Sequence, residues 1–156
     1  MVLGFDKARK PRLLVIPPLF EEANKFRRQV TEIMRRLNEA GVDCFCPDLP
    51  GCNESLAPFA AQTLAGWRAA ATRASAHFSA THVLALRAGC WLAPESLPGW
   101  LYAPAKPATV LRTMLRARAL AAREAGREEN ANDLLAQART DGIELAGWSL
   151  GAALVA

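Results

Sequence analysis

Two five-residue segments have the composition of a tight turn that presents one side chain for chemistry. Residues 147–151 read GWSLG, a G-x-S-x-G pattern in which a serine on a sharp strand-to-helix turn can act as a nucleophile. Residues 85–89 read ALRAG, with small residues two positions before and after Arg87. Because such a turn crowds the positions that flank its central residue, both segments satisfy its steric requirement. The sequence therefore offers Ser149 and Arg87 as candidate functional residues.

A catalytic role for Ser149 needs partners that the following residues do not supply. A nucleophilic serine requires a histidine to take its proton and a carboxylate to orient that histidine. The residues after Ser149 read LGAALVA, with neither group, although both usually follow the serine of this motif. His77 and His82 precede it, so they would serve only in an unusual chain order. Ser149 therefore stays open as the nucleophile of an ester or thioester hydrolase that lacks a complete triad.

Arg87 has a different chemistry, because a guanidinium stays protonated and has no lone pair with which to attack a carbonyl. It can instead hold a carboxylate or phosphate of a small-molecule ligand, or form a structural salt bridge. Glu21, Asn24 and Asp48 are the other polar residues that we expect at the same edge of the fold. An acidic side chain at a helix start, such as Glu21, also simply stabilises the helix dipole.

Apolar patterning predicts the elements that position these residues. Short apolar runs at 13–16, 42–46 and 82–86 are typical of buried strands. Helices are expected between them, one with apolar residues from Phe26 to Leu37 that ends at Gly41, and one over about 60–78. This order predicts an α/β fold with a mostly parallel, three-layer sheet and helices on both faces. Ligands of such sheets bind at the carboxyl ends of the strands, where Arg87 is expected.

The second half is less regular. Its prolines, interleaved with aromatic residues, predict a loop after residue 94; they are Pro94, Pro98, Pro104 and Pro107. An arginine-rich helix should follow, then a helical stretch at 132–138, a strand at 143–148 and a helix over 149–156. Residues 94–140 are compatible with a lid or cap insertion and equally with surface structure. The length of 156 residues indicates a single domain, 1–156.

Charge, apolar runs and cysteine spacing limit the partners, location and cofactors that we expect for the protein. The formal net charge of +4 is small, and the arginines are spread along amphipathic segments, so we expect no nucleic-acid partner. No apolar run reaches the roughly 18 residues that span a bilayer, and no signal peptide is recognisable, so we expect a cytoplasmic protein with reduced cysteines. Cys44, Cys46 and Cys52 lack the spacing of a zinc site. No metal and no cofactor are therefore predicted.

Five segments together resemble the exosortase A system-associated hydrolase 2 family: LLVIPPLFEEANKFRR (13–28), DLPGCNES (48–55), ALRAG (85–89), LRAR (115–118) and ELAGWSLGAALVA (144–156). The resemblance implies a bacterial α/β-hydrolase fold, encoded near genes for exopolysaccharide production and exosortase-dependent protein sorting. It also implies an arginine at the position of Arg87, and a residue other than serine at the position of Ser149.

Two departures from that fold are expected. Residues 1–11 are too short for the antiparallel hairpin that usually precedes the first strand, and further sheet usually follows the last strand. The resemblance therefore implies a short, truncated or compact member, whose open sheet edge at 143–148 could pair two copies into a homo-oligomer.

Three functions follow from these observations. The leading one is a hydrolase-fold protein without a complete triad that binds an anionic or acyl small molecule near Arg87. The second is an active hydrolase that uses Ser149. The third is an interaction module that docks on an acidic protein or lipid surface through the arginine-rich helix, which contains Arg112, Arg116, Arg118 and Arg123.

Overall fold

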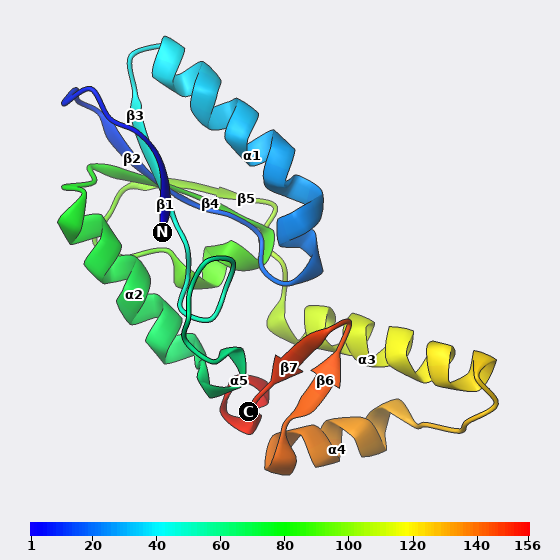
Figure 1. Ribbon diagram of the computed structural model, residues 1–156. Helices are drawn as coiled ribbons and strands as arrows, with labels where there is room; N and C mark the ends of the chain where they lie inside the picture. Colours follow the sequence, from blue (N-terminus) through cyan, green and yellow to red (C-terminus); the bar gives the residue numbers. More distant parts are fainter.

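A five-stranded, mostly parallel sheet forms the centre of the molecule in a computed structural model that describes residues 1–156 (Figure 1). The strands are β1 (Val2–Phe5), β2 (Arg12–Ile16), β3 (Asp43–Pro47), β4 (His82–Leu86) and β5 (Gly99–Tyr102). Their order is β1-β3-β2-β4-β5, with β1 antiparallel to β3 and every other neighbouring pair parallel. The predicted α/β class with a mostly parallel sheet is confirmed, and the N-terminal segment contributes one antiparallel strand.

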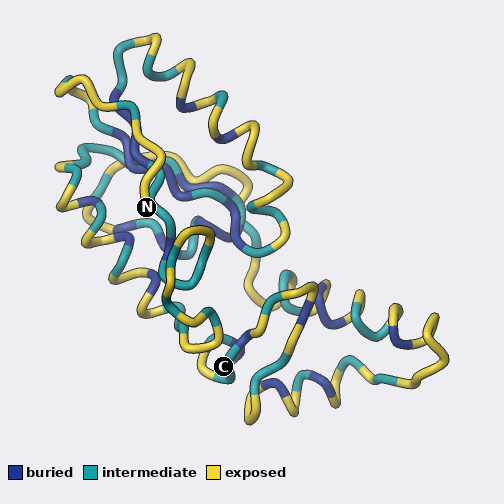
Figure 2. Tube along the Cα trace, viewed as in Figure 1, coloured by how far each residue is buried: buried dark blue, intermediate teal, exposed yellow.

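Each face of the sheet has its own buried apolar layer. The two helices that cover these faces are α1 (Glu21–Glu39) and α2 (Leu64–His77). In β2, Leu13 and Val15 belong to the cluster that contains Val30 and Met34 of α1, whereas Leu14 belongs to the cluster on the α2 side. This alternation follows from the two-residue period of a strand, and it explains why β2 reads as a continuous apolar run. Figure 2 shows the buried residues concentrated along the central strands.

The C-terminal half forms a second packed unit beside the carboxyl ends of the strands (Figure 1). Its elements are α3 (Pro107–Glu124), α4 (Ala131–Asp141), β6 (Ile143–Leu145), β7 (Trp148–Leu150) and α5 (Ala152–Val155). Two short helices remain: η1 (Phe59–Ala61) contacts β7, and η2 (Arg87–Leu92) packs on β4, β5 and α2. Buried residues of α3, α4 and the hairpin make a separate apolar cluster. Phe20, Phe59 and Leu154 pack against both this cluster and the α2 side of the sheet. The two units are therefore joined by apolar contacts.

Two sequence-based expectations for this half are wrong. The proline-containing loop includes a strand, β5, which pairs with β4; a Cβ at Gly99 would lie 1.9 Å from the Val83 carbonyl oxygen, so the close approach depends on glycine. The strand expected at 143–148 and the helix at 149–156 are instead the antiparallel hairpin β6–β7 followed by the short α5. Residues 143–148 are therefore no edge of the main sheet, whose outer strands are β1 and β5.

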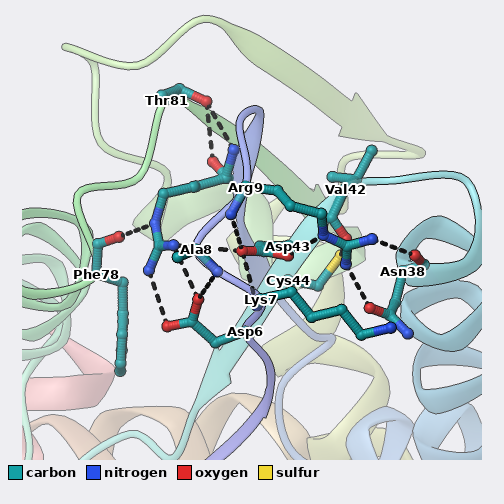
Figure 3. Close-up of polar contacts among 11 residues, drawn as sticks. Asp6, Lys7, Ala8, Arg9, Asn38, Val42, Asp43, Cys44, Phe78 and Thr81 are labelled. Atoms are coloured by element: carbon teal, nitrogen blue, oxygen red, sulfur yellow. Dashed lines mark hydrogen bonds and ion pairs between the residues drawn. The ribbon is translucent and has the colours of Figure 1, made fainter.

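A buried carboxylate holds the β1–β2 connection at the amino ends of the strands (Figure 3). Asp43 is fully buried and accepts hydrogen bonds from the backbone N–H groups of Lys7 (3.1 Å) and Arg9 (2.8 Å), from Arg9 Nε (2.7 Å) and from Arg12 Nη1 (3.3 Å). Arg12 also binds Asp6 at 3.0 Å. Burial alone would raise the pKa of Asp43, but the donors of Arg9 and Lys7 outweigh it and hold the pKa below its ordinary value. No pattern in the sequence predicted this network.

Candidate ligand-binding site

Arg87 occupies a sharp strand-to-helix turn. It follows β4 directly, has a φ of 55°, and begins η2. A positive φ is uncommon for a residue other than glycine, and such outliers gather at functional sites. Two residues later, a Cβ at Gly89 would lie 2.2 Å from the Pro17 carbonyl oxygen, so the turn and the end of β2 approach each other only because residue 89 is glycine. The crowded turn predicted from the ALRAG segment is present.

The guanidinium of Arg87 is anchored on one side and open on the other. Its Nε lies 3.3 Å from both carboxylate oxygens of Glu22, its Nη2 donates to Glu22 Oε1 at 3.1 Å, and its Nη1 donates to the Ala103 carbonyl at 3.2 Å. These bonds use three of the five N–H groups of a guanidinium. The side chain is 35% exposed, and the hydrogen bond to Glu22 raises the pKa of Arg87. Two N–H groups therefore remain for a ligand.

The loop that leads into α1, the helix whose Glu22 binds Arg87, has free backbone donors. Phe20, with a φ of 57°, precedes the first residue of α1, and no side chain caps this helix. The N–H groups of Leu19 and Phe20 make no hydrogen bond within the protein. Pro17 and Pro18 have no N–H to give, so Leu19 and Phe20 are the first donors of this loop. Free N–H groups at a helix start favour an anion.

None of the other predicted binding residues makes a hydrogen bond or an ion pair with Arg87. Glu21 is exposed and pairs with Lys25 at 3.1 Å. Asn24 is exposed and lines a polar surface hollow formed by α1 alone. Asp48 accepts a hydrogen bond from Asn53 Nδ2 at 2.8 Å, and lies 3.5 Å from the N-terminal amine. The acidic partner of Arg87 is Glu22, one residue along from the predicted Glu21.

Ser149 does not lie on a strand-to-helix turn, and that expectation is wrong. It is the middle residue of β7, opposite Glu144 of β6, and its exposed side chain makes no hydrogen bond. Ala146 and Gly147 have φ values of 50° and 79°, as the two central residues of a type I′ hairpin turn require. The positive φ expected of a nucleophile turn is found at Arg87 instead.

Packing accounts for the other residues of the GWSLG segment. Trp148 packs on Phe59, with ring centroids 4.8 Å apart, and Leu150 is buried. A Cβ at Gly151 would lie 2.0 Å from the Ala60 carbonyl oxygen, so glycine permits the close approach of η1. Since the hairpin turn requires Gly147, the pattern arises here from local structure.

Neither histidine lies at the carboxyl edge of the sheet. His82 begins β4, its Nδ1 lies 2.9 Å from Thr81 Oγ1, and its ring stacks on Trp100. His77 is the last residue of α2, on the side from which the chain enters β4. A proton acceptor of this type is therefore absent beside Arg87, and Ser149 has no hydrogen-bonded base.

The cysteines are poor candidates for chemistry. Burial raises the pKa of Cys44 to about 11, that of Cys46 to about 12 and that of Cys52 to about 11. No group of three or more His, Cys, Asp or Glu side chains is placed to hold a metal ion. No helix has the length and apolar composition needed to cross a membrane.

Comparisons with protein-family models, with curated proteins and with solved structures found no significant match. The chemistry of the site therefore rests on its geometry. The feature that sequence reasoning missed is the pairing of Arg87 with Glu22 and with the Ala103 carbonyl. Its only signal in the sequence was the position of Glu22 in the first turn of a helix that follows a strand.

Proposed function

We propose that the chain has an α/β-hydrolase-like fold in which the turn that normally presents a nucleophile carries Arg87, and that the protein binds an anionic or acyl-containing small molecule there. The observation that carries the proposal is the geometry of Arg87, which combines a φ of 55°, a position at the tip of β4 and a partly exposed guanidinium. Backbone strain costs roughly 1–3 kcal/mol, and it persists where the surrounding structure holds it in place. Such strain is typical of residues that a fold holds in position to contact a ligand.

Catalysis by this site would need a different residue. A guanidinium supplies charge and directed N–H groups, which suit a carboxylate or a phosphate, but it cannot form an acyl-enzyme. The proposal is therefore a binding function, in a protein of the exosortase-associated type that the sequence resembles. The cytoplasmic location expected from the sequence belongs to the same proposal.

Glu22 makes the binding competitive. An incoming anion must share the guanidinium with a carboxylate that already neutralises it. The pair is only partly buried, with Glu22 29% exposed, so its attraction is worth about 1 kcal/mol after screening by solvent. Glu22→Gln removes the competing charge and keeps the side-chain shape, and we expect it to strengthen anion binding roughly fivefold.

Thermal unfolding in the presence of inorganic phosphate or acetate tests the proposal. Sodium chloride at equal ionic strength serves as the salt control, because screening alone also changes stability. We expect phosphate or acetate to raise the Tm of the wild type, and Arg87→Ala to abolish that rise. Arg123→Ala removes an exposed arginine of α3 and is the matched control, which should keep the wild-type response. An equal rise in Arg87→Ala would refute a site at Arg87.

The proposal also includes association of two copies through an open sheet edge, at β5 in place of residues 143–148. β5 ends the sheet and exposes Trp100, Leu101 and Tyr102. An apolar free edge is a template for strand pairing. In sedimentation equilibrium, we expect the weight-average mass of Leu101→Lys to be lower than that of the wild type and close to that of a monomer. A wild type that is monomeric at all concentrations would refute this part of the proposal.

A further inference from the structure

A cavity of about 820 Å³ lies between α3, α4 and residues 150–156, and it extends to Phe20, Leu64 and Trp91 beside the sheet. Of its 19 lining residues, 14 are hydrophobic. Its volume falls in the range of pockets that hold small molecules, about 300–1,000 Å³. An apolar lining of this extent favours a ligand with a hydrocarbon portion, because withdrawing that portion from water drives binding.

Three arginines stand around this apolar lining without acidic partners. Arg112 and Arg116 lie one turn apart on α3, and Arg139 lies on α4. All three side chains are exposed, and none makes an ion pair or a hydrogen bond within the protein. No aspartate or glutamate lines the cavity, and the carboxylate of Ala156, the last residue, which also lines it, pairs with none of the three arginines.

The neighbouring arginine shows the contrast. Arg118 of α3 is bound by Glu129, with Nε 2.8 Å from Oε2, and it also donates to the Glu144 carbonyl at 3.0 Å. Arg118 is thus structural and does not line the cavity. Arg123 and Arg127 are also without ion pairs but do not line the cavity, so Arg112, Arg116 and Arg139 are the unpaired cations whose charge an anionic group of a bound ligand would complement.

We propose that this cavity binds one saturated fatty-acyl chain with an anionic head group. The hydrocarbon lies among the apolar side chains of α3, α4 and α5, and the head group lies at Arg112, Arg116 and Arg139. A purely ionic ligand would leave the apolar lining unused, and a neutral lipid would leave the three cations unpaired. Arg87 does not line this cavity, so the inference goes beyond the function proposed above and stands without it.

A series of straight-chain carboxylates, used below the concentrations at which they form micelles, tests the apolar part. Binding is measured by displacement of a fluorescent fatty acid. We expect affinity to rise roughly fourfold for each added methylene until the cavity is filled, and then to level off. Acetate and an alkyltrimethylammonium ion of the same chain length should fail to displace the probe. Affinity independent of chain length would overturn the proposal.

Three variants test the position of the ligand. We expect Arg112→Ala combined with Arg116→Ala to weaken dodecanoate binding at least tenfold and to leave dodecanol binding unchanged. Arg123→Ala, on the same helix but away from the cavity, is the matched control, and an equal loss there would overturn the assignment of the head group. Leu135→Trp fills the cavity and should weaken both ligands.

Further outcomes separate this site from its alternatives. Arg87→Ala should bind dodecanoate as the wild type does, so a loss of anion binding at Arg87 and a loss of dodecanoate binding in the cavity are distinguishable. If Leu135→Trp dissociates a dimer and leaves dodecanoate binding intact, the occupant of the cavity is a second copy of the chain, and the proposal is wrong.

Discussion

The clearest test of the packing at the amino end of the sheet is the substitution Asp43→Ala. The Asp43 carboxylate is fully buried and accepts hydrogen bonds from two backbone N–H groups and two arginine side chains (Figure 3). Its removal leaves three donors, the N–H groups of Lys7 and Arg9 and the Nε of Arg9, without an acceptor, whereas Arg12 Nη1 keeps Asp6 at 3.0 Å. Arg9 and Arg12 also lose compensating charge. We expect the folded state to persist and to be markedly less stable.

The magnitude follows from the exposure of the partners. Breaking a buried ion pair by removal of one member costs about 3–5 kcal/mol. Arg9 and Arg12 are 27% and 16% exposed, so water compensates part of their loss and the lower end of that range applies. We therefore expect Asp43→Ala to lower the free energy of unfolding by about 3 kcal/mol, which for a chain of this size lowers the Tm by roughly 6–12 °C.

Urea unfolding followed by circular dichroism measures this difference. Asp6→Ala is the matched control, because Asp6 also pairs with Arg12 but its side chain is 50% exposed, and we expect a much smaller change than for Asp43→Ala. Equal effects of the two substitutions would contradict the reasoning, since they would show that burial does not decide the contribution of these carboxylates. An Asp43→Ala effect under about 1 kcal/mol would contradict it equally.

Three other predictions concern stability and labelling. Arg12 lowers the pKa of Asp6 from 3.8 to about 2, and Arg35 lowers the pKa of Glu32 from 4.5 to about 2. The stability that these two ionised carboxylates contribute is therefore complete above about pH 5 and is lost as the pH falls towards 2. Urea unfolding midpoints measured across this pH range test this dependence. Gly89→Ala should cost at least about 2 kcal/mol, because its Cβ would meet backbone 2.2 Å away, whereas Gly4→Ala, with its nearest contact at 3.5 Å, should cost less than about 1 kcal/mol in the same assay. A fluorophosphonate probe should leave Ser149 unmodified in peptide mass spectra, and an adduct that Ser149→Ala abolishes would restore the hydrolase alternative.

Much of the sheet could be predicted from the sequence because its central strands are buried on both faces. The runs at β2 and β4 are apolar and short, and they are separated by helices, of which α1 has a clear apolar stripe. β5 escaped prediction for the opposite reason. All four of its residues are exposed, its apolar run is only three residues long, and it lies between Pro98 and Pro104, so the prolines outweigh the strand signal. Its pairing depends on the approach of Gly99 to Val83, which is a tertiary contact.

The candidate site shows the same division. The small residues around Arg87 predicted a tight turn, because that requirement is local and steric. The contact between Arg87 and Glu22 joins residues 65 positions apart, and no local pattern distinguishes Glu22 from Glu21. The GWSLG segment misled for a related reason. The small residues Ala146 and Gly147 are compatible with a two-residue hairpin turn and also with a strand-to-helix turn. Only the pairing of β6 with β7 shows that the hairpin turn forms.

The most direct test of the central claim is an NMR titration that follows the Nε–H signal of Arg87, assigned by its loss in Arg87→Lys, while inorganic phosphate is added at constant ionic strength. If Arg87 binds anions, its signal shifts and saturates, and the shift occurs at lower phosphate concentration in Glu22→Gln. If the Arg87 signal stays fixed while those of other arginines move, the Arg87–Glu22 pair is a structural salt bridge and the proposed function is wrong.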